Sequence, residues 1–232
     1  MARREAILEA TRALIEEQGI EALTIKAVAE RVDCAVGTLY TSFASKGALV
    51  AALQVEAITR LGAAYAAAAE GLEDDLAVAG LDVDTAALAR VVAFGRSTIA
   101  VGRVLPEEYR LQQRLLNTPS GYDDEDLARV TSVAFEVLAR PERLLREAAV
   151  LGVVDEGDAF DRTVTLVAAI NGVLTLAAIE WPGADSFEPA ALADRLHLDL
   201  LRGWGADPAV LAVADAAAPI HRIATLLEGH SR

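Results

Sequence analysis

Residues 24–46 carry the pattern that decides the fold: TIKAVAERVDCAVGTLYTSFASK. Thr24 is a good N-cap residue, because its hydroxyl can accept a hydrogen bond from a free amide of the first helical turn. We therefore expect a helix over 25–32. Its apolar positions share one face, and they are Ile25, Val28, Ala29 and Val32.

A second short helix is expected directly after the first. Asp33-Cys34 predicts a tight turn, followed by a helix over 35–42 in which Leu39, with Phe43 beyond it, is spaced to face a core. Upstream, residues 3–18 repeat apolar side chains at the helical spacing. Three short helices with a tight turn between the second and third are the arrangement of a helix-turn-helix unit.

The rest of the chain also predicts helices, so the fold class is all-α: an N-terminal three-helix helix-turn-helix domain over 1–47 and a helical bundle over 48–232. Gly71 to Asp84 is acidic and predicts a loop. The expected helices cover about 46–70, 85–102, 106–117, 124–150 (broken or kinked at Pro141), 158–180, 189–203 and 208–228.

Composition narrows the function classes. The net charge of −14 argues against nucleic acid. Residues 1–50, however, carry six Lys and Arg against seven Asp and Glu, so most of the acidity lies in the body. No uninterrupted apolar run reaches the length of about 18–20 residues that spans a bilayer. The run from Val164 to Ile179 predicts a buried helix, and the protein is expected to be cytoplasmic without a membrane partner.

The stretch from Thr24 to Lys46 resembles the helix-turn-helix of TetR-family repressors. The match is carried by Gly37-Thr38-Leu39-Tyr40, then Phe43, Ser45-Lys46 and Ala48-Leu49, and it covers residues of about 3–60. The resemblance implies a DNA-binding transcriptional regulator, expected to be a repressor, that binds a pseudo-palindromic operator in double-stranded DNA.

The physical properties of the motif agree with that role. Gly37 lets the backbone approach DNA closely. Thr38 and Thr41 can hydrogen-bond to bases or phosphates, and Lys46 lies near a helix N-terminus that favours anions. The candidate DNA-binding residues are Thr24, Lys26, Ala35, Val36, Gly37, Thr38, Tyr40, Thr41 and Lys46.

The turn departs from the family's common pattern. Glycine is usual where Asp33 stands, although Asp tolerates a left-handed conformation. Cys34 stands at a usually hydrophobic position and is interpreted as a core residue. Ala35 and Val36 replace residues that are commonly polar, and they could contact thymine methyl groups.

The body is expected to bind a small effector and to dimerise. The resemblance implies a small-molecule cavity within the helices that follow the head. The ligand is expected to be apolar or weakly polar, because aromatic and amide side chains dominate the candidate residues and the acidic body repels anions. Candidate ligand-binding residues are Phe94, Tyr109, Gln112, Gln113, Phe135 and Asn171. A homodimer is expected through about 160–204, where Asn171-Gly172 favours close helix packing.

Two other function classes stay open. One is a helical interaction or ligand-binding protein that has lost DNA binding; the other is an all-α enzyme. No nucleophile-base arrangement, phosphate loop or metal-ligand spacing is visible, so we expect no enzyme, cofactor or metal. Scattered residues receive structural or surface interpretations: His197, His221 and His230, and the arginines Arg96, Arg103, Arg110 and Arg114 on solvated helix faces.

Overall fold

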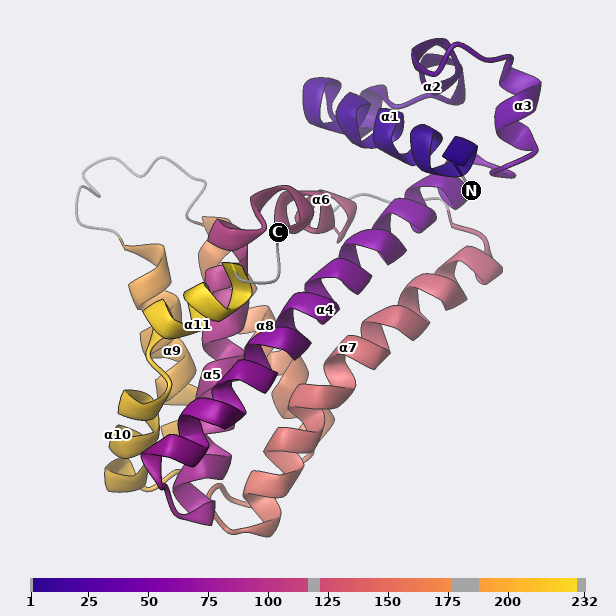
Figure 1. Cartoon of the computed structure of the whole chain (residues 1–232). Helices are drawn as coiled ribbons and strands as arrows, with labels where there is room; N and C mark the ends of the chain where they lie inside the picture. The colour runs from indigo at the N-terminus through magenta and orange to yellow at the C-terminus, as the bar shows by residue number, and fades with distance from the viewer. Residues whose placement is uncertain (1, 117–121, 177–187, 229–232) are drawn as a thin grey trace. The chain divides into compact units, whose positions relative to one another are not determined.

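The computed structural model describes residues 2–116, 122–176 and 188–228, and within these ranges the chain is all-α without a strand (Figure 1). The predicted fold class is confirmed. The elements are α1 (Ala2–Gln18), η1 (Ile20–Ala22), α2 (Ile25–Arg31), α3 (Val36–Tyr40), α4 (Lys46–Ala79), α5 (Val83–Val104), α6 (Pro106–Leu116), α7 (Asp124–Val150), α8 (Ala159–Leu176), α9 (Pro189–Gly203), α10 (Pro208–Ala217) and α11 (Ile220–Glu228). The expected helix ends at 117 and 177–180 lie outside the described residues.

The chain divides into two compact units. Unit 1 comprises residues 1–61 and 107–137, and unit 2 comprises residues 62–106 and 138–232. Unit 1 therefore includes α6 and the first half of α7 in addition to the three N-terminal helices and the start of α4.

Unit 1 has its own hydrophobic core. The side chains of Ile7, Ile15, Leu39, Leu49 and Leu53 are fully buried in it. Leu111 of α6 belongs to the same cluster. These contacts hold α3 in place from its inner face, and its outer face is left exposed.

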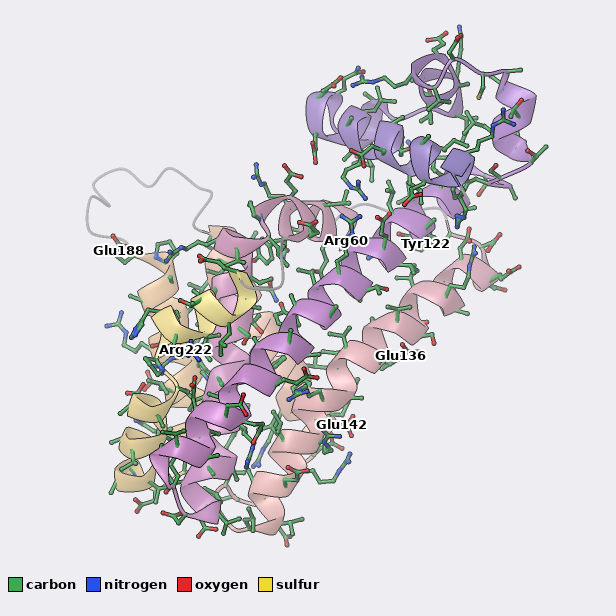
Figure 2. All side chains as sticks on the ribbon, viewed as in Figure 1. Arg60, Tyr122, Glu136, Glu142, Glu188 and Arg222 are labelled. Carbon is green, nitrogen blue, oxygen red and sulfur yellow. The ribbon has the colours of Figure 1, made fainter. Side chains whose placement is uncertain are left out.

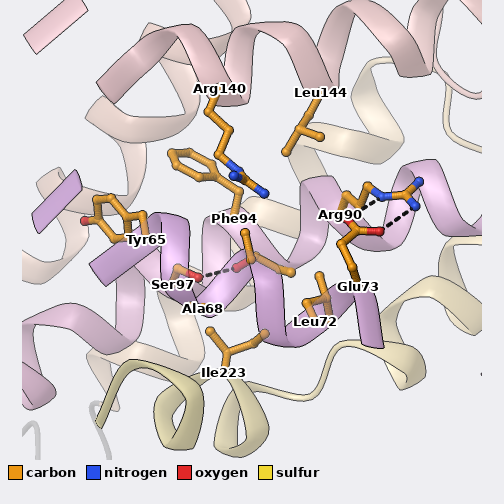
Figure 3. A pocket seen from close by; sticks show the side chains of 12 residues that line it. Tyr65, Ala68, Leu72, Glu73, Arg90, Phe94, Ser97, Arg140, Leu144 and Ile223 are labelled. Atoms are coloured by element: carbon orange, nitrogen blue, oxygen red, sulfur yellow. Dashed lines mark hydrogen bonds and ion pairs between the residues drawn. The ribbon is translucent and has the colours of Figure 1, made fainter. Parts of the chain in front are cut away.

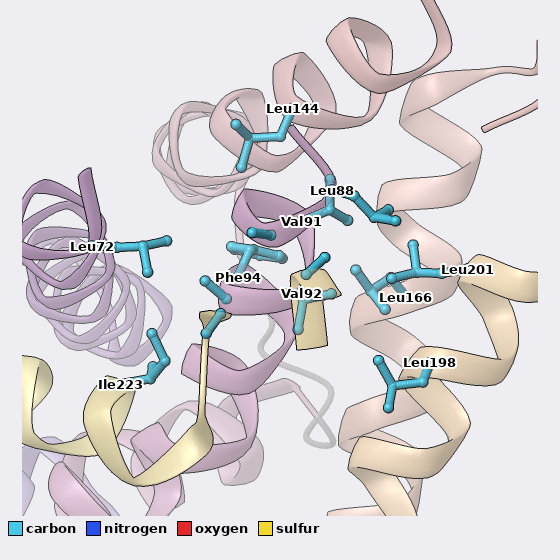
Figure 4. Packing of buried hydrophobic residues seen from close by; sticks show 14 of the residues in the cluster. Leu72, Leu88, Val91, Val92, Phe94, Leu144, Leu166, Leu198, Leu201 and Ile223 are labelled. Carbon is cyan, nitrogen blue, oxygen red and sulfur yellow. The ribbon is translucent and has the colours of Figure 1, made fainter. Parts of the chain in front are cut away.

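Unit 2 is built around α5, which contacts α8, α9, α10 and α11. Leu88 and Val92 of α5 are fully buried, and they pack with Leu166 of α8 and Leu201 of α9 (Figure 4). A helix that is buried on nearly every side needs an almost wholly apolar sequence. The stretch Ala86 to Val92, interrupted only by Arg90, has that character.

Helix α4 is longer than predicted, because it continues from Glu70 to Ala79 through the expected acidic loop. Leu72 and Leu76 extend its buried stripe and are 2% and 4% exposed. Burial of these leucines outweighs the weak helix propensity of Gly71. A Cβ at Gly71 would lie 2.4 Å from Cδ2 of Leu226, so the glycine allows α11 to pack closely. Helix α7 continues through Pro141.

The single helix predicted over 208–228 is wrong, because α10 and α11 are separate helices. The break falls at Ala218-Pro219, where proline cannot donate the hydrogen bond that would continue the helix. Helix α11 is anchored instead by Arg222, labelled in Figure 2, whose Nε lies 2.7 Å from Oδ2 of Asp75 on α4.

The placement of Arg96 on a solvated helix face is also wrong. Its side chain is only 6% exposed. The guanidinium donates to both carboxylate oxygens of Asp194 on α9, at 2.8 and 3.0 Å. It also donates to the carbonyls of Asp215 and Ala218, both at 2.8 Å, and pairs with the Asp215 carboxylate. Arg96 therefore joins α5 to α9 and caps the end of α10.

Within the described residues, three segments are long and apolar enough to cross a membrane, by length and composition alone: Lys46–Ala79, Ala159–Leu176 and Pro208–Glu228. The sequence predicts no such segment because no apolar run is long enough without interruption. A helix can nevertheless be apolar enough on average while it contains an occasional polar residue. The expectation that Val164 lies on a buried helix is corrected as well. Only 17% of α8 is buried within the chain, and Val164 is 42% exposed.

Candidate functional site

Hydrogen bonds fix both ends of α2, at its N-cap and at the turn that leads into α3. The Thr24 hydroxyl accepts from the Ala27 amide at 3.1 Å, as the N-cap prediction requires. Asp33 takes the left-handed conformation with φ of 50°, and the Cys34 amide then donates to the Ala29 carbonyl at 3.0 Å. Asp fills this position because its short polar side chain tolerates positive φ better than most residues.

Helix α3 is anchored from one side only. Leu39 and Phe43 are 0% and 3% exposed and fasten the helix to the unit 1 core. On the opposite side Val36 and Tyr40 are 39% and 52% exposed. Exposed apolar and aromatic side chains on a short, well-packed helix are available to a partner.

The nine candidate DNA-binding residues lie on α2, on α3, at the start of α4 and beside these helices. Thr38 is half-buried and the other eight are exposed. We call the set the α2–α3 surface. The structure therefore leaves every one of them accessible.

Salt bridges determine which basic side chains of unit 1 can interact with an anionic partner. Arg31 forms a bidentate pair with Glu17, and this pairing lowers the pKa of Glu17 and raises that of Arg31. Lys26 lies 3.7 Å from Glu30, with both side chains well exposed. Lys46 donates from Nζ to the Ile20 carbonyl at 3.3 Å. This hydrogen bond holds Lys46 at the start of α4 and leaves its positive charge to interact with an anionic partner.

One residue near this surface was missed by the sequence reasoning. The guanidinium carbon of Arg4 lies 4.5 Å from the centre of the Phe43 ring, just beyond α3. A cation over an aromatic face is attracted by the ring quadrupole. The Arg3-Arg4 pair at the start of α1 was the available signal, but spacing alone does not show that α1 points its first turn toward Phe43.

A cavity lies within unit 2 and is lined by α4, α5, α7 and α11 (Figure 3). Its volume is about 20 Å³, which is room for about one water molecule. Tyr65 and Phe94 meet edge to face on its wall, with ring centres 5.9 Å apart. The lining residues are Tyr65, Ala68, Ala69, Leu72, Glu73, Arg90, Ala93, Phe94, Ser97, Arg140, Leu144 and Ile223.

Of the six candidate ligand residues, Phe94 alone lines this cavity. Tyr109, Gln112 and Gln113 lie on α6 in unit 1, where burial raises the pKa of Tyr109 against a hydrogen bond to Gln113. Phe135 is 56% exposed. Asn171 of α8 donates to the Val167 carbonyl of its own helix at 2.8 Å.

Helix α8 carries an apolar outer face. Val164, Ala168, Gly172 and Leu176 are exposed, whereas Leu166 and Ile170 face α5 and α9. A Cβ at Gly172 would meet no atom of the described residues within 4 Å, so none of these residues packs there. Residues 177–187, which fall within the expected interface, lie outside the described residues.

No cluster of three or more His, Cys, Asp or Glu side chains that could hold a metal occurs in the described part of the chain. Cys34 is half-buried and packs against the unit 1 core. His197 is fully buried and His221 is exposed, while His230 lies outside the described residues.

Comparison with known proteins identifies relatives of the N-terminal segment. Residues 7–53 match the family model of bacterial regulatory proteins of the tetR family. The transcriptional repressor KstR of Rhodococcus jostii is 59% identical over 44 residues, which are 19% of this chain and 21% of KstR. The match therefore spans about a fifth of that relative's length.

Solved structures resemble the whole chain in fold. TylP of Streptomyces fradiae, a TetR regulator, has a TM-score of 0.60 at 24% identity and covers 99% of this chain and 98% of its own. RolR in complex with resorcinol has a TM-score of 0.56 at 18% identity, covering 93% and 94%. The helix-turn-helix segment of the chain therefore resembles that of tetR-family regulatory proteins, and the rest of the chain resembles solved TetR regulators in fold.

Proposed function

We propose that this protein is a transcriptional repressor that binds a pseudo-palindromic DNA operator through the α2–α3 surface. One observation carries the proposal: a short helix fastened by Leu39 and Phe43 presents an outer face whose candidate contacts are all accessible. In helix-turn-helix proteins the second helix enters the major groove, and its first turns read base edges. The named function of KstR points the same way.

The residues of the surface divide into two roles. Val36, Thr38 and Tyr40 are presented by α3 and are proposed to meet base edges and the adjoining backbone. Lys46 and Arg4 carry charge at its margin and are proposed to meet phosphates. Phosphate contacts position a protein on DNA, whereas base contacts determine the sequence it prefers.

Two further parts of the proposal concern the body. We propose a cytoplasmic homodimer formed through α8 and α9, because the exposed apolar face of α8 would otherwise meet water. We also propose a small effector in the unit 2 cavity. Its wall is aromatic and aliphatic, and its volume of about 20 Å³ means that the surrounding helices must move apart to admit a ligand. RolR is a fold relative crystallised with a ligand.

Selection of binding sites from random double-stranded DNA tests the repressor proposal. We expect an enriched pseudo-palindrome with half-sites about one helical turn or more apart. The affinity should be about 10⁻⁸ to 10⁻¹¹ M at physiological salt. Failure to enrich any sequence would contradict the proposal and would favour a helical protein that has lost DNA binding.

Two variants separate the roles of the contacts. Lys46→Ala should weaken binding to every sequence alike and make the salt dependence shallower by about one phosphate contact. Thr38→Ala should change the preferred sequence instead. Arg103→Ala, on an exposed position of α5, is the matched control and should change neither property.

A further inference from the structure

Helix α3, the proposed recognition helix, lacks the side chains that most often read bases by hydrogen bonds. From Ala35 to Ser45 the chain contains no Arg, Lys, Asn, Gln, Asp or Glu. In the major groove these residue types distinguish base pairs, because their groups match the pattern of donors and acceptors on a base edge. Helix α3 must therefore obtain its sequence preference from other contacts.

The hydroxyl groups of α3 and its C-cap offer little selectivity instead. The Thr41 hydroxyl donates to the Thr38 carbonyl at 2.6 Å, so its single proton is already used within the chain. Thr38 is half-buried, and Tyr40 carries its hydroxyl at the end of an exposed ring. A hydroxyl can donate or accept, so it distinguishes base pairs less sharply than a bidentate side chain does.

The start of α3 presents apolar side chains. Ala35, its N-cap residue, makes no side-chain cap hydrogen bond, and Val36 in the first turn is 39% exposed. The apolar group that base pairs present in the major groove is the C5-methyl group of thymine. Val36 branches at Cβ, so it holds two methyl groups on a stiff side chain that loses little freedom on contact.

The neighbouring Gly37 leaves room for close contact. A Cβ at Gly37 would meet no atom of the described residues within 4 Å, and its φ does not lie in the left-handed region. The described fold therefore has no steric need for glycine here, although glycine is a poor helix former. The missing side chain allows a base edge to approach the backbone beside Val36.

We propose that Val36 selects a thymine in each operator half-site by packing against its C5-methyl group. The inference rests on the proposed function and adds to it the kind of base contact that gives the sequence preference. Lys46 and Arg4, proposed to meet phosphates, contribute affinity but not this selection, because phosphates are the same at every base pair.

Deoxyuridine scanning of the operator tests this contact. Each thymine of the site enriched from random DNA is replaced in turn by deoxyuridine, which lacks the methyl group and keeps the hydrogen-bonding atoms of the base. With the native protein, one replacement in each half-site should weaken binding about fourfold, the effect of losing one buried methyl group. The loss should be equal at low and high salt, because a methyl group releases no counterions.

The Val36→Ala variant assigns the contact to this side chain. Val36 lies outside the unit 1 core, so its truncation should leave the fold intact. The variant should bind the thymine and deoxyuridine sites equally. Lys46→Ala is the matched contrast, which should bind both sites more weakly and keep the fourfold difference. A deoxyuridine penalty that survives Val36→Ala would report DNA shape instead and overturn the inference, as would a native protein that tolerates every replacement.

The failure of this inference is distinguishable from the failure of the proposed function. If no sequence is enriched from random DNA, the repressor proposal is wrong and the inference is wrong with it. If a site is enriched and bound but shows no thymine preference that depends on Val36, the proposed function stands and only the inference is lost.

Discussion

Among single residues, His197 is a polar group enclosed without hydrogen bonds. Its ring is completely buried, and neither ring nitrogen has a partner within the described residues. Desolvation lowers its pKa from 6.5 to about 4, opposed by the charge of Asp194 and reinforced by that of Arg96. The folded protein therefore holds His197 neutral at physiological pH.

This environment predicts acid sensitivity. Between pH 6.5 and about 4 the unfolded chain binds the proton more readily than the folded one, so stability falls as the pH falls through that window. The loss from this group should reach about 3 kcal/mol, at about 1.4 kcal/mol per pKa unit. Urea unfolding at several pH values should show a smaller acid loss for His197→Leu than for the native chain. His221→Leu, on the exposed surface, should behave as the native chain; an unchanged slope in His197→Leu would refute the assignment.

Arg96 links α5 to α9 and to the end of α10, so its removal should destabilise the protein. Its removal would leave Asp194 and two helix-end carbonyls without their donor. Breaking a buried pair by removing one partner is strongly destabilising, and partial exposure of the carboxylates reduces the effect to about 2–4 kcal/mol. Chemical denaturation of Arg96→Met measures it. Arg103→Met, exposed on the same helix, should change stability by less than about 0.5 kcal/mol, and equal effects in both variants would show that Arg96 is not an anchor.

At the scale of elements, the approach of α9 to α5 depends on Gly95. A Cβ at this position would lie 2.5 to 2.7 Å from the His197 ring atoms. Glycine is otherwise the poorest helix former apart from proline, so close packing explains its place in the middle of a buried helix.

Gly95→Ala should therefore destabilise the protein by about 1–3 kcal/mol, because overpacking outweighs the gain in helix propensity. The opposing ring is the specific cause, so His197→Ala should reverse the sign of the effect in the double variant. A double-mutant cycle from denaturation curves measures this coupling. Independent, additive effects would show that the ring does not limit the packing.

Contacts between elements explain why the predicted end of α4 and the predicted single helix over 208–228 are wrong. Gly71 and the acidic residues after it predict a loop by local propensity, but Leu72 and Leu76 are buried by α5 and by the helices after it. Between α10 and α11 the sequence predicts a continuous helix, whereas the structure has a break. An apolar pattern continues through Ala218-Pro219, while proline and the donors of Arg96 favour a break.

At the level of the whole molecule, the described residues form one main hydrophobic cluster in each unit and leave an apolar face exposed on α8. The face on α8 consists of Val164, Ala168, Gly172 and Leu176, and the proposed dimer would cover it. Stable homodimer interfaces bury well above about 1,200 Å² of surface in total.

Gly172→Glu should produce monomers, because it places a charge in the centre of that face. Sedimentation at micromolar concentration measures the change, and DNA binding should weaken with it. Val213→Glu, an exposed apolar position of α10, is the control and should remain a dimer. A dimer in both variants would place the interface elsewhere.

Local chemistry was sufficient to predict the helix-turn-helix. The Thr24 cap, the left-handed Asp33 and the inward Leu39 depend on neighbours within a few residues, and the exposed face of α3 follows from them. The tertiary structure alone decided which helices surround α5, and so which side chains meet. Only Phe94 of the expected ligand residues lines the cavity, and Arg96 became a buried anchor while Arg140 faces the cavity. Those outcomes depend on contacts between residues far apart in the chain, and helical periodicity reports which residues share a face but not which helix covers it.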